Sequence, residues 1–573
     1  MERPRITDKF SFNQTPQEKG KRPPIMYYNL TTQQQQWVDR TLAALTLEQA
    51  IAQLVNVTRP VEDAGVWLRL LEQWPVGCMS LRTKSADAYQ QVISAVQQHA
   101  AIPLLVVANM EHGAAEWPGY GADFPMLMAA GAANDEALIA ELGRATAVEA
   151  RHLGVNWVLT PDIDLNYNFD NPVTNIRALG DKPELVSRLA CALIEALQTH
   201  GVAATAKHFP GDGMDDRDQH LVTTVNHLPF DQWLATYGEV WRRAIAAGVM
   251  TIMPGHISLP DYQGHRADPD AAAPATLSRK LLIELLRQEL GFTGLIVSDS
   301  TSMAGLTTRA APAERIVASL AAGIDLYLGA EPERDLPHVL QAVRAGRLTE
   351  EEIYASARRV LTVKAQLNLV DEPLGPAPTA EQQAAFARAA QTMADKSITV
   401  LRGADQLPVR LPPGAKVLTV TVAKLNPFFG QKDLEVFDEE LRQRGFAVEH
   451  LLNPKTAELQ ELAQQCDAVF VNICVTPLAT MGTARIALDS FGTWGWRALF
   501  TEHPHVFYTS FGSPYLLYEL PHIPNLLVAY GDAEVSQRAA VKVWLGEMEA
   551  QGVLPVTLPQ VRVRRFEENS MLA

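Results

Sequence analysis

The feature that most constrains this chain is an alternation of short apolar runs with amphipathic segments through its first two thirds. The runs have strand length and are bounded by turn residues, whereas segments such as 135–153 and 183–200 carry apolar residues at helical spacing. The runs occupy residues 54–58, 76–81, 103–108, 155–160, 202–209, 249–253, 295–300 and 324–329. A doubly wound open sheet gives the same alternation, but eight repeats within about 280 residues favour a closed parallel (β/α)8 barrel of the TIM type.

A second domain is predicted after these repeats, because 573 residues are too many for one hydrophobic core. Four further apolar runs alternate with helical segments near the C-terminus, at 416–423, 468–475, 506–512 and 525–530. Proline, glycine and polar residues concentrate at 371–383, as in a linker. We therefore expect an N-terminal extension over 1–40, a catalytic barrel over 41–370, this linker, and an α/β sandwich domain over 384–573.

The charge balance argues against two classes of partner. Lysine and arginine total 49 against 65 aspartate and glutamate, which gives a net charge of −16. Such a field repels phosphate backbones and anionic lipid, so neither nucleic acid nor a membrane surface is an expected partner. No apolar stretch reaches the length of a membrane span and the N-terminus has no apolar signal core, so we expect a cytoplasmic protein. The four cysteines form no CxxC pattern and are expected to be buried thiols.

Two loops after strand-like runs hold the candidate catalytic groups, because reactive groups of a parallel barrel gather at the carboxyl ends of its strands. The string KHFPGDGMDDRDQH spans 207–220, and SDSTSM at 298–303 contains Asp299. A carboxylate there can attack a sugar acetal, while Asp218 can orient His220 for proton transfer. The alternatives are a solvated acidic turn and a metal site, but the spacing matches neither HExxH nor a calcium loop, so no metal and no cofactor are expected.

The strings KHFPGDG and DQH resemble the signature of glycoside hydrolase family 3, in its β-N-acetylhexosaminidase branch. Further matching strings lie in the same order along most of the chain, at 154–186, 274–303, 322–329 and 394–401. The resemblance implies that Asp299 is the nucleophile, that His220 is the general acid/base and that Asp218 is its partner. It also implies that Lys207, His208 and Arg177 bind the sugar, with Lys207 and His208 donating to ring hydroxyls.

One segment departs from the family pattern. Where the family reads like DxEGGxVxR after the third strand, this chain reads NMEHGAAEW at 109–117. Asn109 stands in place of a sugar-binding Asp, His112 in place of a Gly and Trp117 in place of a substrate-binding Arg. Asn109 can still donate and accept a hydrogen bond, and Glu111 keeps its position, so both are expected to bind substrate. His256, after the sixth run, is a weaker candidate. These changes leave the identity of the sugar open.

The expected function is that of a retaining exo-β-N-acetylglucosaminidase, which removes terminal β-linked N-acetylhexosamine from an amino-sugar oligosaccharide or glycoside by double displacement. Related alternatives are a β-glucosidase, a glucosaminidase, an N-acetylgalactosaminidase, or a phosphorylase that uses phosphate as the acceptor. From other classes, a catalytically silent sugar-binding protein and a metal-dependent hydrolase remain open. Retention of Asp299, Asp218 and His220 together argues against the silent protein.

Overall fold

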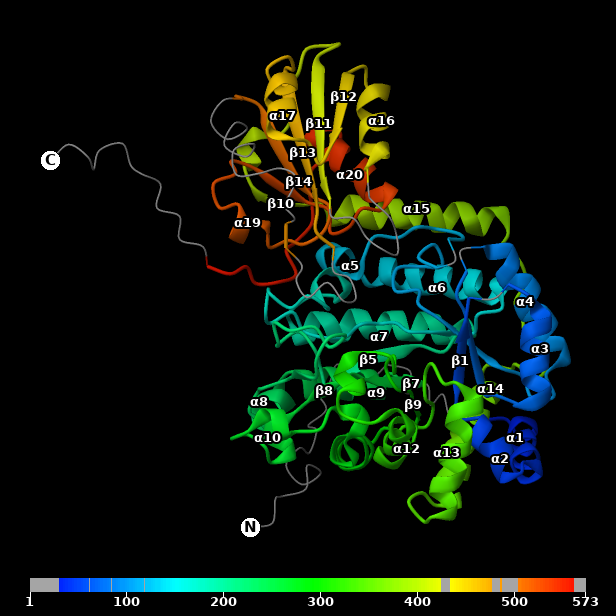
Figure 1. The fold of residues 1–573 in the computed structure, drawn as a ribbon. Helices are drawn as coiled ribbons and strands as arrows, with labels where there is room; N and C mark the ends of the chain where they lie inside the picture. The colour runs from blue at the N-terminus through cyan, green and yellow to red at the C-terminus, as the bar shows by residue number, and fades with distance from the viewer. Residues whose placement is uncertain are drawn as a thin grey trace, which may run out of the picture.

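The structure is a computed structural model that describes residues 30–60, 62–83, 85–117, 119–423, 433–476, 485–486 and 503–560 (Figure 1). It is a mixed α/β protein with parallel sheets, as the alternating pattern predicts. Each of the eight predicted runs contains residues in parallel pairing. Among the helices of the described residues, none has the length and apolar character that a transmembrane span requires.

The strands of the first part pair in a continuous sequence. One parallel sheet has the order β1-β2-β3-β4 and another has the order β5-β7-β9. Isolated parallel bridges join β4 to Ala203 before β5, residue 297 after β9 to Leu326, and Tyr327 to Val55 before β1. The bounds are β1 Asn56–Arg59, β2 Cys78–Leu81, β3 Leu105–Ala108, β4 Trp157–Val158, β5 Thr205–Phe209, β7 Thr251–Pro254 and β9 Leu295–Ile296, with a separate short pair β6 Thr224–Val225 and β8 Ile257–Ser258.

The helices between these strands begin and end at residues suited to helix termini. Asp135 caps α6 by accepting from two backbone N–H groups, and Gly154 ends the same helix in the left-handed conformation. The segment expected to be helical at 278–291 forms the π-helix η6. The bounds are α1 Thr32–Ala44, α2 Leu47–Ala52, α3 Ala64–Gln73, α4 Ala86–His99, α5 Leu127–Ala133, α6 Glu136–Leu153, η3 Asn175–Arg177, α7 Pro183–Thr199, α8 Phe230–Ala235, α9 Tyr237–Ala246, α10 Pro260–Gln263, η4 Pro269–Ala271, η5 Ala275–Leu277, η6 Lys280–Glu289, α11 Ala304–Thr307, α12 Pro312–Ala322, α13 Pro332–Arg344 and α14 Glu350–Gln366.

Two elements begin inside segments that composition assigns to irregular chain. Helix α15 (Ala380–Ser397) starts within the expected linker, because the Thr379 side chain accepts from the Gln382 backbone and Gln382 returns the bond in a capping box. Helix α1 likewise starts at Thr32, within the expected N-terminal extension, behind a capping box at Thr31. In Figure 1, α15 lies between the C-terminal sheet and helices α5 and α6.

The C-terminal part is a six-stranded sheet in the order β10-β15-β14-β13-β11-β12, parallel except for the edge strand β10. Separate buried clusters lie on its two faces, as in a three-layer α/β arrangement. One cluster includes Met128 of α5 and Ile176 of η3, so this face packs against the segment that carries Arg177. The bounds are β10 Thr399–Arg402, η7 Ala404–Gln406, β11 Lys416–Ala423, α16 Glu435–Gln443, β12 Ala447–Leu452, α17 Thr456–Ala463, β13 Ala468–Cys474, β14 Val506–Ser510, α19 Leu516–Glu519, β15 Leu526–Val528 and α20 Glu534–Trp544.

Candidate active site

Asp299 follows β9 and faces two histidines of the site. Its Oδ1 accepts from the Ser300 backbone N–H at 2.6 Å, and the residue is only 9% exposed. Burial favours the protonated carboxyl, but the neighbouring His208, His256 and His220 outweigh burial and lower the pKa of Asp299. The carboxylate is therefore ionised at neutral pH, as a nucleophile at a sugar carbon must be.

Asp218 and His220 form the hydrogen-bonded pair that their spacing predicts. Asp218 is buried, and its Oδ1 accepts from both the backbone N–H and the Nδ1 atom of His220, at 2.8 and 2.7 Å. A carboxylate can only accept, so Nδ1 carries the hydrogen and Nε2 is the nitrogen left for proton transfer. The His220 side chain is 21% exposed, which leaves its ring open to a bound molecule.

Glu111, Arg177 and Lys207 form a buried ionic cluster at the ends of three different segments. The Glu111 carboxylate accepts from Arg177 Nε at 2.9 Å and Nη2 at 2.7 Å, and from Lys207 Nζ at 2.6 Å. Burial favours protonation of Glu111, but the two cations outweigh it and hold the pKa of this carboxyl below its usual range. Glu111 thus fixes the two cations in place, and they supply the N–H donors of this part of the site.

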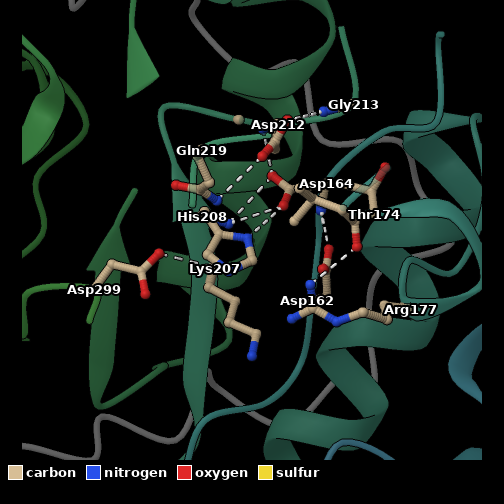
Figure 2. Close-up of polar contacts among 12 residues, drawn as sticks. Asp162, Asp164, Thr174, Arg177, Lys207, His208, Asp212, Gly213, Gln219 and Asp299 are labelled. Carbon is tan, nitrogen blue, oxygen red and sulfur yellow. Dashed lines mark hydrogen bonds and ion pairs between the residues drawn. The ribbon is translucent and has the colours of Figure 1, made fainter. Parts of the chain in front are cut away.

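His208 points one ring nitrogen at a carboxylate and the other at Asp299 (Figure 2). Its Nδ1 lies 2.7 Å from Asp164 Oδ2, while its Nε2 lies 4.0 Å from Asp299 Oδ2. Burial lowers the pKa of His208 to about 4, so the ring is neutral and its one hydrogen is on Nδ1. With its hydrogen on Nδ1, His208 offers Nε2 as a hydrogen-bond acceptor toward Asp299.

Three buried carboxyl groups behind His208 are absent from the sequence-based set of site residues. Asp162 and Asp164 directly follow the fourth apolar run, which is the signal that could have found them, and Asp212 lies in the KHFPGDG string. Burial, together with the neighbouring carboxyl groups, raises the pKa of Asp162 and Asp212, and burial raises that of Asp164. Asp164 accepts from the backbone N–H groups of His208 and Asp212, which makes it the favoured member to carry the charge.

Asp162, Asp164 and His208 each offer a ligand atom within 4.8 Å of the others, so these residues could hold a metal ion. All three are buried, and the Asp164 and His208 atoms that would bind the ion already bond to each other. Within the described residues, Asp162 Oδ2 is the one oxygen of the cluster without a hydrogen-bond partner. The bond between Asp164 and His208 thus occupies two of the three atoms that a cation would need.

Comparisons with known proteins identify the family of this chain. Residues 46–363 match the family described as the glycosyl hydrolase family 3 N terminal domain. The chain belongs to glycoside hydrolase family 3. It is 32% identical over 541 residues to a β-N-acetylglucosaminidase/β-glucosidase from Cellulomonas fimi, an alignment that covers 91% of this chain and 95% of the relative. The family and these matches make the chain a glycosidase.

Two solved structures are similar to this chain over nearly their full length. One is the β-glucoside phosphorylase BglX bound to 2FGlc, with a TM-score of 0.84, 28% identity, and coverage of 93% of this chain and 98% of that chain. The other is a family 3 β-N-acetylglucosaminidase from Paenibacillus sp. str. FPU-7, with a TM-score of 0.79, 28% identity, and coverage of 90% and 99%. Similarity to family 3 enzymes therefore extends through the C-terminal part.

The residues that depart from the family 3 pattern lie in different surroundings. Asn109 directly follows β3 and is exposed, so its amide is accessible to a ligand. His112 lies against Phe124, whose carbonyl oxygen is 3.1 Å from Nδ1. Burial disfavours its charged form, but Asp123 and Glu116 raise the pKa of His112 to about 9. His112 is thus occupied by structural partners, whereas Asn109 stays available.

His256 is fully buried and uses both ring nitrogens within the protein. Its Nε2 lies 2.9 Å from the Ser300 carbonyl oxygen, and its Nδ1 lies 2.9 Å from Thr276 Oγ1. A carbonyl oxygen only accepts, so Nε2 carries the hydrogen and Nδ1 accepts from the threonine. His256 therefore holds the backbone beside Asp299 rather than facing a substrate.

Proposed function

We propose that the chain is a retaining exo-β-N-acetylglucosaminidase that hydrolyses terminal β-linked N-acetylhexosamine. The observation that carries this proposal is the Asp218–His220 pair, whose loop bonds to the segment after Asp299 through the Ala304 N–H and the His220 carbonyl oxygen at 2.9 Å. A nucleophilic carboxylate and a separate proton donor are the two groups that double displacement needs. The names of the Cellulomonas and Paenibacillus relatives support N-acetylglucosamine as the sugar.

In the first step the imidazolium form of His220 protonates the departing glycosidic oxygen while Asp299 attacks the anomeric carbon. The bond between that carbon and the leaving oxygen breaks, and an ester to Asp299 forms. In the second step neutral His220 takes a proton from water as the water oxygen attacks the same carbon and releases Asp299. Two inversions at one carbon retain the anomeric configuration.

The remaining site residues hold the sugar. Lys207 and Arg177 donate to its hydroxyls and are fixed by Glu111, while His208 accepts a hydroxyl hydrogen at Nε2. Asn109, at the open end of β3, is proposed to contact a further hydroxyl. A site built from both donors and acceptors selects one pattern of hydroxyl groups.

Replacement of Asp299 by Asn tests the nucleophile without changing side-chain size. We expect loss of turnover of aryl β-N-acetylglucosaminide, while the wild-type enzyme incubated with a slow fluorinated glycoside accumulates a covalent adduct on the peptide that contains Asp299. Mass spectrometry of digested protein locates that adduct. Wild-type turnover by the Asp299→Asn enzyme, or an adduct on another carboxylate, would overturn the assignment.

A second candidate activity is cleavage of β-glucosides with phosphate as the acceptor. Its support is the 0.84 TM-score to a β-glucoside phosphorylase, together with Asn109 in place of the family Asp. Nitrophenyl β-glucoside and nitrophenyl β-N-acetylglucosaminide, each assayed with and without phosphate, separate the two proposals. Formation of a glycosyl phosphate identifies phosphorolysis, and free sugar that is independent of phosphate identifies hydrolysis.

We further propose that the strands of the first part close into a (β/α)8 barrel, since the two parallel sheets and the isolated bridges connect successive strands. On this proposal the catalytic domain spans residues 41–370, and an α/β sandwich domain spans 384–573. The net charge of −16 is compatible with a neutral sugar substrate and disfavours a nucleic-acid or membrane partner. We also propose that the protein is cytoplasmic. Fractionation of the native cell tests the location.

A further inference from the structure

Gln219 lies between the two members of the catalytic pair and is fully buried. Its side-chain amide bonds in two directions. Nε2 donates to Asp212 Oδ2 at 3.1 Å, and Oε1 accepts from the His256 backbone N–H at 2.9 Å. Figure 2 shows Gln219 directed toward Asp212, away from Asp299. The side chain between Asp218 and His220 is thus a fixed tether, although it is not placed to touch a substrate.

One end of this tether is anchored to the sugar-binding end of β5. Asp212 Oδ1 accepts from Asn171 Nδ2 at 2.8 Å and from the Gly213 backbone at 2.7 Å. The Asp212 backbone N–H donates to Asp164 Oδ1 at 2.7 Å, and Asp164 also holds the ring of His208. Through Asp212, therefore, Gln219 is tied to the group that fixes His208.

The other end is anchored to the nucleophile. The backbone of His256 bonds to Gln219, while its ring bonds to the Ser300 carbonyl directly after Asp299. The loop and the nucleophile turn are also in direct contact, because a Cβ on Gly305 would lie 2.6 Å from the Gln219 carbonyl oxygen. The Ala304 backbone donates to the His220 carbonyl at 2.9 Å.

We propose that Gln219 is a positioning residue. Its amide joins the loop that carries His220 to the turn that carries Asp299. It thereby sets the distance between the proton donor and the nucleophile that act on one glycosidic bond. This proposal rests on the proposed function, in which His220 is the acid/base and Asp299 the nucleophile. Only an amide makes both bonds, because its nitrogen donates to Asp212 Oδ2 and its oxygen accepts from the His256 N–H. A glutamate keeps the acceptor but has no amide N–H to donate to Asp212.

The proposal predicts a defect confined to the proton-transfer step. A misplacement of about 1 Å at a catalytic group costs on the order of 100-fold in rate. A dinitrophenolate leaving group departs without being protonated. A methylumbelliferyl leaving group is poorer, so its departure depends on protonation by the acid. For Gln219→Leu and Gln219→Glu we expect kcat/KM to fall about 100-fold with the methylumbelliferyl glycoside and to change little with the dinitrophenyl glycoside.

Gln97 supplies a matched control. It is buried like Gln219 and makes two backbone bonds of 2.9 Å, to the oxygen and the nitrogen of Leu104. Gln97→Leu removes the same number of bonds away from the site, so any change in its kcat/KM should be equal for both leaving groups. A change that depends on the leaving group in the Gln97 variant would show that general loosening produces the signature, and would overturn the proposal.

His220→Ala separates failure of this inference from failure of the proposed function. If kcat/KM of the His220→Ala enzyme falls equally with both leaving groups, His220 is not the acid and the proposed function fails. If His220→Ala shows the selective loss but neither Gln219 variant does, Gln219 does not position the acid and the inference alone fails. Gln219→Glu keeps the length and the acceptor of the native side chain, so it provides the test where Gln219→Leu does not fold.

Discussion

Replacement of Lys364 by methionine should stabilise the protein near neutral pH and remove one component of its pH dependence. Lys364 lies in α14 with no exposed surface, and its Nζ donates to Gln53 Oε1 at 2.7 Å. Burial lowers the pKa of Lys364 from 10.5 to about 7, and the buried Cys78 thiol only partly offsets this. The ammonium group is therefore less stable in the folded protein than in water.

The magnitude follows from the difference between the two pKa values of Lys364. Between pH 7 and pH 10.5 the unfolded chain binds the proton and the folded protein does not, so the free energy of unfolding rises by about 1.4 kcal/mol per pH unit. Below pH 7 the full penalty of about 5 kcal/mol is present. Methionine removes this penalty but leaves Gln53 Oε1 without a donor, which costs about 1–3 kcal/mol, so the net gain at pH 7 is about 2–4 kcal/mol.

Urea unfolding of the native and Lys364→Met proteins, followed by circular dichroism at pH 6.5, 7.5 and 8.5, measures this difference. All other titratable groups are common to both proteins. Their titration therefore largely cancels when the two free energies of unfolding are subtracted. The gain from methionine should shrink as the pH rises. Lys455→Met, at an exposed lysine, should show no such trend. A Lys364→Met protein that is less stable than native by the same amount at every pH would refute the reasoning, because the native ammonium would then be favourably paired.

Three further outcomes follow from the site. Glu111→Gln keeps the size of the side chain but leaves Arg177 and Lys207 without their carboxylate. We therefore expect the free energy of unfolding to fall by about 3–5 kcal/mol and KM to rise. An unchanged melting temperature would contradict this. Asp162→Asn should preserve stability at pH 5, because burial raises the pKa of Asp162 to about 7 and its carboxyl is then protonated and uncharged like an amide; a large drop in melting temperature at that pH would contradict this. EDTA should leave kcat/KM unchanged, since none of the proposed steps uses a metal ion, and recovery of lost activity by a divalent cation would overturn this.

The order of strands and helices could be predicted because buried parallel strands read as apolar runs. The strands that were missed are the two edge strands of the C-terminal sheet and the short pair β6 and β8 of the first part. Residues of β12 alternate between exposed and partly buried through Ala447–His450, and β10 pairs antiparallel on one side only. The start of α15 was missed because its capping box depends on Thr379 and Gln382 in a segment dominated by proline and polar residues.

The pairing of Asp218 with His220 could be predicted because the two residues lie two positions apart in one loop. The partners of the other site residues come from distant parts of the chain. Whether His208 donates or accepts depends on Asp164, 44 residues away, and the cations at Glu111 come from positions 66 and 96 residues further along. Sequence patterns identify residue types at strand ends, whereas protonation and hydrogen-bond direction arise only once those ends meet.

The charges around Asp299 bear on which molecule attacks the glycosyl-enzyme. In that intermediate Asp299 is an uncharged ester, His220 has given up its proton, His208 is neutral, and Glu111 offsets only one of the two cations it binds. A carboxylate acid/base would leave a negative charge there after protonating the leaving group, which would repel a phosphate anion. Water needs His220 as a base, but phosphate is already ionised. Phosphate should therefore restore turnover of a dinitrophenyl glycoside by the His220→Ala enzyme with glycosyl phosphate as product, and no acceleration would show that the site excludes the anion.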